Sequence, residues 1–182
     1  EVTLDFIAGD LRHLRLLYPR DEWQAFVDSL AFSLGRLAMY IKLGTPPDVI
    51  HCNEWQTALI PVLVRFAPFF SKTGTVLTLH NLTHQGSFPI EWLPFTGIPL
   101  DRVDLAKITH HGRLCLLKAG IAYADKVVTV SQRYAEETSQ NFVPVDIEEL
   151  KGGLGFGLQE ILQERRERGD FVGITNGIDA EA

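Results

Sequence analysis

Cysteine and basic residues are both scarce in this sequence. Only 2 of its 182 residues are cysteine, and neither Cys52 nor Cys115 has the paired spacing typical of a metal site or a disulfide framework. Lysine and arginine number 17 against 23 aspartate and glutamate residues, so the formal net charge is -6 at pH 7. We therefore expect free buried thiols in a reducing compartment. We also expect no nucleic-acid partner, because no dense basic cluster is present to bind a phosphate backbone.

Long apolar runs are lacking as well. A membrane-spanning helix needs about 20 mainly apolar residues in succession, and every apolar stretch here is interrupted earlier by Arg, Lys or His. The opening residues, Glu1-Val2-Thr3-Leu4-Asp5-Phe6, have neither the positive charge of a signal peptide nor a start methionine. We therefore expect a soluble protein with no membrane partner, and a chain that begins inside a longer one.

Helical and strand-like segments alternate along the chain. Hydrophobic residues make up 46% of it, enough for one globular core at this length. Apolar residues recur at three- and four-residue steps, as in amphipathic helices, over 21–43 and 55–66. Further helices are expected over 113–123, 131–140 and about 155–168, where the same order of helix and strand repeats. Short apolar runs predict strands at 48–52, 75–79, 126–130 and 171–174. This alternation predicts an α/β fold, namely a Rossmann-like parallel sheet with helices on both faces.

Particular residues mark where some of these segments begin and end. Gly44-Thr45-Pro46-Pro47 is expected to end the first helix, because proline has no backbone donor. Ser131 can cap the helix that follows it. A glycine-rich stretch before the last helix is interpreted as a loop and helix entry without a phosphate-binding role, and it contains Gly152, Gly153, Gly155 and Gly157.

Residues 82–108 lack any regular periodicity. Glycine and proline interrupt the segment at Gly86, Pro89, Pro94, Gly97 and Pro99. The segment follows a predicted strand, and ligands of open parallel sheets bind beyond the carboxyl ends of strands. A functional loop and a solvent-covering excursion both fit this position.

Four motifs follow one another along the chain. The first is Pro-Asp-Val-Ile-His-Cys-Asn-Glu-Trp-Gln-Thr at 47–57, and the second is Thr-Leu-His-Asn-Leu-Thr-His-Gln-Gly at 78–86. The third combines Leu-Lys-Ala-Gly-Ile at 117–121 with Ala-Asp-Lys-Val-Val-Thr-Val-Ser at 124–131. The fourth is Gly-Ile-Thr-Asn-Gly-Ile-Asp at 173–179. In this order they resemble bacterial glycogen synthases and plant starch synthases, retaining glucosyltransferases of glycosyltransferase family 5 with the two-domain GT-B architecture. The resemblance covers residues 47–179 closely, and the first 45 residues only as a preceding helix.

The resemblance implies transfer of glucose from ADP-glucose, or less often UDP-glucose, to the non-reducing end of an α-1,4-glucan with retained anomeric configuration. It implies no cofactor beyond this donor. Residues 1–182 would form part of the N-terminal, acceptor-side domain, without the opening glycine motif that contacts the donor and without the C-terminal nucleotide-sugar domain. The chain alone is then expected to be inactive. The protein is expected in the cytoplasm, or in the plastid if it comes from a plant.

Two other functions fit the same residues. One is a noncatalytic glucan-binding or regulatory protein that kept this fold after losing the donor-binding domain. The other is a different GT-B transferase, of the sucrose or trehalose type.

His80, Glu54 and Asn176 are the predicted catalytic residues. The resemblance places His80 at the transferred sugar, where neutral imidazole offers one donor and one acceptor; the alternative is a core histidine bonded to backbone. Glu54 and Asn53 stand where the family usually has aspartate and histidine. The Glu54 carboxylate could accept hydrogen bonds from sugar hydroxyls or stabilise the start of the next helix. Asn176 could orient sugar or phosphate oxygens, or only form a turn with Gly177.

Asn81, Gln85 and Gly86 are predicted to bind substrate. The two amides would face the cleft, and Gly86 would permit a tight backbone bend. His80 and His84 are four residues apart, a spacing that suits a metal on a helix, whereas this segment is predicted as strand and loop. We therefore expect no metal site.

Overall fold

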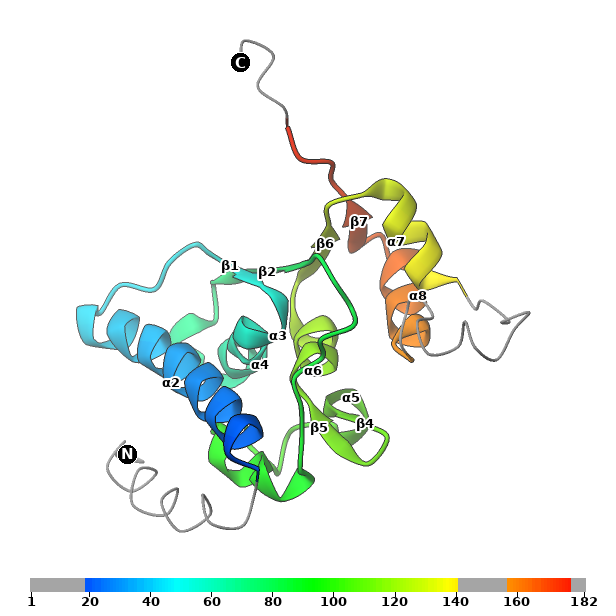
Figure 1. Cartoon of the computed structure of the whole chain (residues 1–182). Helices are drawn as coiled ribbons and strands as arrows, with labels where there is room; N and C mark the ends of the chain where they lie inside the picture. The colour runs from blue at the N-terminus through cyan, green and yellow to red at the C-terminus, as the bar shows by residue number, and fades with distance from the viewer. Residues whose placement is uncertain (1–18, 141–156, 178–182) are drawn as a thin grey trace.

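A computed structural model describes residues 19–140 and 157–177 of the chain (Figure 1). The helices are α2 (Arg20–Leu43), α3 (Glu54–Thr57), α4 (Leu59–Phe66), α5 (Leu105–Ile108), α6 (Leu116–Tyr123), α7 (Gln132–Ser139) and α8 (Gln159–Glu167), with the 3₁₀ turns η1 (Pro68–Phe70) and η2 (Ile90–Thr96). The strands are β1 (Val49–Asn53), β2 (Gly74–Leu79), β3 (Ser87–Phe88), β4 (Thr109–His110), β5 (Arg113–Cys115), β6 (Lys126–Thr129) and β7 (Phe171–Gly173). Across these two ranges, no helix combines the length and apolar character needed to cross a membrane.

Four strands form a parallel sheet in the order β1-β2-β6-β7. Leu77 of β2 pairs with Cys52 of β1 and with Val127 of β6, and Val127 pairs in turn with Phe171 of β7. All four side chains are buried, so this row forms the centre of the core. The apolar runs at 48–52, 75–79, 126–130 and 171–174 thus form the predicted strands. The predicted fold class, a parallel sheet flanked by helices, is confirmed.

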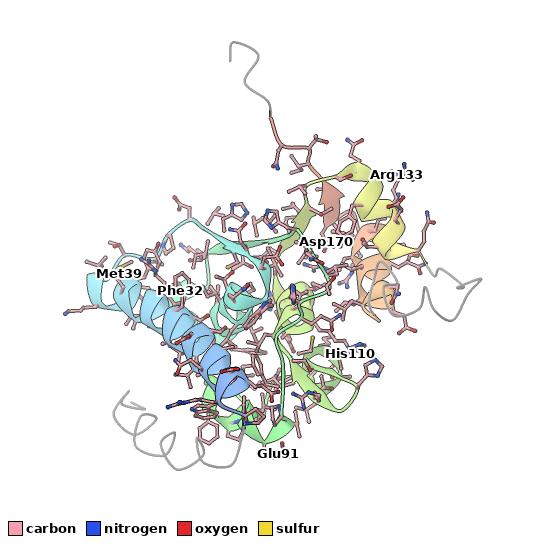
Figure 2. All side chains as sticks on the ribbon, in the orientation of Figure 1. Phe32, Met39, Glu91, His110, Arg133 and Asp170 are labelled. Atoms are coloured by element: carbon pink, nitrogen blue, oxygen red, sulfur yellow. The ribbon has the colours of Figure 1, made fainter. Side chains whose placement is uncertain are left out.

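The strand order advances in one direction as the chain proceeds. Right-handed crossovers that advance in one direction place their helices on the same face of a sheet. The face that carries Leu77 is buried accordingly, whereas Val49 and Val172 on the opposite face are 59% and 44% exposed. Phe32 and Met39 on α2 are exposed as well (Figure 2). Within residues 19–140 and 157–177, the helices therefore cover one face of the sheet more completely than the other.

Helix α2 confirms the predicted helix 21–43 and packs through one apolar stripe. Its buried apolar residues are Trp23, Phe26, Leu30 and Leu37. Trp23 meets Trp92 of η2 edge-on at a ring-centroid distance of 4.9 Å, and Phe26 meets Phe88 of β3 at 5.1 Å. Aromatic pairs at this separation stabilise a fold beyond the area they bury. The helix ends where Gly44 adopts φ 70°, the left-handed cap that glycine favours.

The segment predicted as one helix over 55–66 is two helices. Helix α3 ends at Thr57 and α4 begins at Leu59, with Ala58 between them. Pro61 lies in the first turn of α4 and cannot donate a hydrogen bond to the carbonyl of Thr57, four residues earlier. Its ring also crowds that carbonyl, which explains why the helix does not continue through this point.

The sequence analysis missed a second sheet, which is antiparallel with the order β3-β5-β4. The segment predicted as a helix over 113–123 begins as strand β5 and becomes helical only at Leu116. Strands β4 and β5 form a hairpin in which His111 and Gly112 have φ 48° and 74°, as in the tight turns that match strand twist. The segment 82–108, predicted as irregular, contains β3, η2 and α5.

The two predicted C-terminal helices are both present, and the second begins later in the sequence than predicted. Ser131 caps α7, since its Oγ accepts a hydrogen bond from the backbone N of Tyr134 at 3.2 Å. Helix α8 begins at Gln159, after Gly157, rather than near 155. The predicted loop residues Gly152, Gly153 and Gly155 lie outside the described residues, as do Ile178 and Asp179 of the fourth motif.

Polar groups join α8 and the start of β6 to the rest of the sheet. Asp125 Oδ2 accepts hydrogen bonds from the backbone N and the Oγ1 of Thr75, at 2.7 and 2.9 Å. Arg165 of α8 is buried, donates to the carbonyl of Ala124 and pairs with Asp170 Oδ2 at 3.1 Å. The aspartate of the third motif therefore has a structural role.

Candidate functional site

The residues that follow the four parallel strands lie at the same edge of the sheet. Parallel strands present their carboxyl ends on the same side. Strand β1 leads into Glu54, β2 into His80, β6 into Ser131 and β7 toward Asn176. This edge is the candidate functional site.

Glu54 and His80 are in direct contact. Glu54 Oε1 accepts hydrogen bonds from the backbone N of His80 at 2.5 Å, from His80 Nδ1 at 2.8 Å and from the backbone N of Asn81 at 3.3 Å. The Glu54 side chain is 23% exposed and the His80 side chain 48% exposed. One carboxylate oxygen therefore holds both the loop after β2 and the histidine ring.

This contact assigns the tautomer of the neutral ring. A carboxylate only accepts, so Nδ1 of His80 carries the proton and Nε2 is left with a lone pair. Across the described ranges, no side chain or backbone group forms a hydrogen bond with Nε2 of His80. A carboxylate that orients an imidazole through Nδ1 is the usual device for presenting Nε2 to a ligand.

Glu54 adopts a backbone conformation that glutamate rarely takes. Its φ is 60°, in the left-handed region. That conformation costs an L-residue roughly 1–2 kcal/mol, and the three hydrogen bonds to Oε1 offset part of this cost. Strained backbone of this kind clusters at functional sites. Aspartate tolerates this region better than glutamate.

Gly86 is required by close packing. Its φ is 58°, and a Cβ at this position would overlap the Trp55 ring at Cε3 and lie 2.9 Å from Cδ2. The carbonyls of Gln85 and Gly86 accept hydrogen bonds from the backbone N of Leu117 and Leu116, both at 3.0 Å. The end of this loop is thus anchored to the start of α6.

The two predicted amide ligands take part in the loop's own structure. Asn81 Oδ1 accepts from the backbone N of Thr83 at 2.9 Å, and its side chain is exposed. Gln85 Nε2 donates to the carbonyl of Leu82 at 3.4 Å, and Cys115 Sγ donates to Gln85 Oε1 at 3.7 Å. Gln85 is therefore turned into the fold, whereas Asn81 remains accessible at the edge.

Asn176 lies on the same edge but is not joined to the Glu54–His80 pair. The backbone N of Ile174 donates to the carbonyl of Thr129 at 2.7 Å, which extends the ladder one residue beyond β7. Asn176 follows as an exposed residue. In the part of the chain that the structure describes, no hydrogen bond links it to Glu54 or His80.

Sequence reasoning missed Tyr134. Its hydroxyl, projecting from α7, accepts a hydrogen bond from the backbone N of Leu82 at 3.3 Å. Burial raises the pKa of Tyr134, the Leu82 hydrogen bond lowers it, and the negative charge of Glu54 raises it further. The sequence could have indicated Tyr134, because the predicted helix capped by Ser131 places Tyr134 in its first turn, beside the strand ends.

No metal-binding cluster occurs within residues 19–140 and 157–177, where no three His, Cys, Asp or Glu side chains converge. His110 and His111 are neighbours with ring centroids 4.0 Å apart, at the tip of the β4–β5 hairpin.

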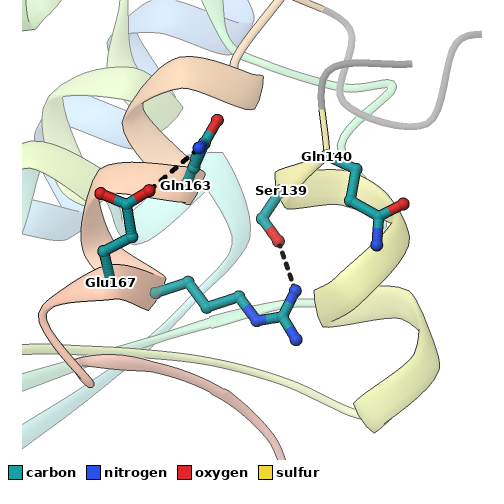
Figure 3. Close-up of a pocket in the computed structure, with 5 residues that line it drawn as sticks. Ser139, Gln140, Gln163 and Glu167 are labelled. Carbon is teal, nitrogen blue, oxygen red and sulfur yellow. Dashed lines mark hydrogen bonds between the residues drawn. The ribbon is translucent and has the colours of Figure 1, made fainter.

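A pocket of about 640 Å³ lies between α7 and α8 (Figure 3). Ser139 and Gln140 line one wall and Gln163, Arg166 and Glu167 the other. Arg166 donates to Ser139 Oγ at 3.3 Å across it. The pocket lies at the C-terminal end of α7, whereas the candidate site borders its N-terminal end, so the pocket belongs to a different region.

The chain is similar over most of its length to known proteins. A model of the family described as "Starch synthase catalytic domain" matches residues 9–164. Glycogen synthase 2 of Geobacter metallireducens is 40% identical over 156 residues, which are 83% of this chain and 30% of that protein. Glycogen synthase of Thermotoga maritima is 39% identical over 157 residues, 84% of this chain and 30% of that protein.

One solved structure agrees with these relatives. The catalytic domain of starch synthase IV from Arabidopsis thaliana, bound to ADP and acarbose, superposes with a TM-score of 0.66 at 28% identity, over 84% of this chain and 30% of that one. The chain thus spans less than a third of the length of these proteins. By its motifs, its fold and the family match over residues 9–164, the chain belongs to the starch synthase catalytic domain family, together with the glycogen synthases.

Proposed function

We propose that the protein containing this chain transfers glucose from a nucleotide-diphosphate glucose to the non-reducing end of an α-1,4-glucan, with retained anomeric configuration. The contact between Glu54 Oε1 and His80 at the carboxyl edge of the sheet carries this proposal. Support comes from relatives named glycogen synthase and from the Arabidopsis starch synthase, which was bound to ADP and acarbose. We take ADP-glucose as the donor, with no further cofactor, and the cytoplasm or a plastid as the location.

In this proposal His80 and Glu54 act as a unit at the transferred glucose. Glu54 holds the Nδ1 proton, and Nε2 of His80 accepts a hydrogen bond from a sugar hydroxyl. The carboxylate also supplies a fixed negative charge beside the sugar, where positive charge develops in the transition state. Asn176 and Asn81, both exposed at the same edge, would contact hydroxyls further out.

We also propose a division of labour between this chain and the rest of the protein. Residues 1–182 contribute part of the acceptor-side domain, and groups elsewhere bind the donor and stabilise the departing diphosphate. Residues 1–182 in isolation are then expected to transfer no glucose. Turnover of ADP-glucose by the isolated chain would refute this division.

The test uses the full-length protein with radiolabelled ADP-glucose and glycogen. His80→Ala and Glu54→Gln are each expected to lower kcat/KM by about 100-fold, as when one preorganised polar group is removed from an active site. His84→Ala is the matched control, because His84 is an exposed histidine in the same loop. Unchanged transfer by both site variants would exclude this site. If the protein transfers glucose to the acceptor of a sucrose- or trehalose-forming transferase and not to glycogen, the proposed acceptor is wrong.

A full-length protein that binds glycogen but transfers no glucose from either ADP-glucose or UDP-glucose would favour a noncatalytic glucan-binding protein. Asn53 and Glu54 favour that alternative, because the family resemblance implies histidine and aspartate at these two positions.

A further inference from the structure

The loop after β2 is held by side chains. Its first two backbone N–H groups, of His80 and Asn81, donate to Glu54 Oε1. The next, of Leu82, donates to the Tyr134 hydroxyl. Three consecutive amides thus depend on two side chains from other elements, α3 on one side and α7 on the other. Glu54 and Tyr134 together therefore hold the first three amides of this loop, the part that carries His80.

Tyr134 is well placed to fix the loop. Its backbone N is held by Ser131 Oγ at 3.2 Å, so the residue is anchored one turn into α7. Its ring is half-buried and packs against the core. Leu82, whose amide it binds, is fully buried. A rigid ring between two anchored points restrains the loop better than a flexible side chain would.

The electrostatics of Tyr134 agree with this position. Burial is the largest influence raising the pKa of its phenol, and the charge of Glu54 acts in the same direction. The phenol therefore stays protonated at neutral pH. Its oxygen accepts the hydrogen bond from Leu82 while the hydroxyl keeps its own proton.

We propose that Tyr134 is a positioning residue for the Glu54–His80 pair, and that it acts by fixing the loop that carries His80 through the amide of Leu82. This inference rests on the proposed glucosyl transfer. His80 lies two residues before Leu82, so a shift of the Leu82 amide changes the direction in which the imidazole points. A misplacement of about 1 Å in an active site can cost up to about 100-fold in rate.

The test is Tyr134→Phe in the full-length protein, with Tyr123→Phe as its matched control. Tyr123 makes the same kind of contact away from the site, because its hydroxyl accepts from the backbone N of Asp104 at 3.1 Å. We expect Tyr134→Phe to lower kcat about tenfold with KM within twofold of the parent value. Tyr123→Phe is expected to leave both parameters unchanged.

A second measurement reports the ring directly. In protein labelled with ¹⁵N-histidine, the His80 signals are assigned by their loss in His80→Ala. We expect Tyr134→Phe, and not Tyr123→Phe, to shift them, because the Nδ1 contact with Glu54 would change.

Three outcomes would overturn the inference. They are an unshifted His80 signal in Tyr134→Phe, an unchanged kcat, or equal losses in both tyrosine variants, which would mark a general effect on folding. A failure of the proposed function appears differently, as unchanged transfer in His80→Ala and Glu54→Gln. The His80 signals then still decide whether Tyr134 positions the ring.

Discussion

Replacement of Gly86 by alanine offers a sharp test of how the loop after β2 is packed. Gly86 has φ 58°, and a Cβ on it would overlap Cε3 of Trp55 and lie 2.9 Å from Cδ2. The Trp55 ring is itself confined, since its centroid lies 5.8 Å from that of Phe88. The substitution therefore adds a backbone penalty and a steric one at the same position.

The two penalties can be assigned separate magnitudes. An L-residue in the left-handed region costs about 1–2 kcal/mol. Forcing an extra methyl group into packed surroundings costs about 1–3 kcal/mol. We therefore expect Gly86→Ala to lower the free energy of unfolding by about 2–5 kcal/mol, a large part of the roughly 5–15 kcal/mol typical of a domain.

Urea unfolding followed by tryptophan fluorescence measures this loss, and two other glycines separate its parts. Gly112 has φ 74° with nothing within 4 Å of the added Cβ, so Gly112→Ala tests the backbone penalty alone. Gly120 has no positive φ, but a Cβ there would lie 2.9 Å from the carbonyl of Ala58, so Gly120→Ala tests crowding without the backbone penalty, less the roughly 1 kcal/mol by which alanine favours the interior of helix α6. If Gly86→Ala loses no more stability than Gly112→Ala, the reasoning about Trp55 is wrong.

Two further predictions concern buried groups. Arg165→Met is expected to lower the free energy of unfolding by about 3 kcal/mol, because it leaves the partly buried Asp170 carboxylate, whose side chain is 17% exposed, without its partner. Arg165→Met combined with Asp170→Asn should recover part of that loss in the same urea assay, and no recovery would contradict the pairing. Burial raises the pKa of Cys52 to about 12, with a hydrogen bond involving Thr57 acting against it. Since an unfolded thiol titrates near 9.0, stability from this group is complete below pH 9 and falls as the pH rises toward 12, by at most about 1.4 kcal/mol per pH unit. Cys52→Ala should remove this part of the alkaline loss, and an unchanged slope would argue against it.

The sequence predicted the regular elements that have a period of their own. Helix α2 shows its buried stripe over 24 residues, and the four parallel strands appear as compact apolar runs. Elements of two to four residues, such as β3, β4 and α5, have no such period. They exist because tertiary pairing brings Ser87 opposite Cys115 and Thr109 opposite Leu114. Local pattern reading therefore assigned 82–108 to a loop and 113–115 to a helix.

The sequence predicted some residues of the candidate site and missed others. Motif order and the family resemblance selected Glu54 and His80, which the structure joins through one carboxylate oxygen. Gln85 and Gly86 were chosen from the same motif, but in the fold they pack the loop against α6 and Trp55. Tyr134 was not selected, since its contact with Leu82 joins residues 52 positions apart.

By itself, the amino-acid sequence determined the fold class, the family and the residues that follow each strand end, because these depend on local periodicity and on motif order. Only the tertiary structure decided which of those residues touch. The left-handed conformation of Glu54, its three hydrogen bonds and the Tyr134 contact arise where separate segments meet. Such contacts depend on distances across the sheet edge, and no local pattern of residues encodes those distances.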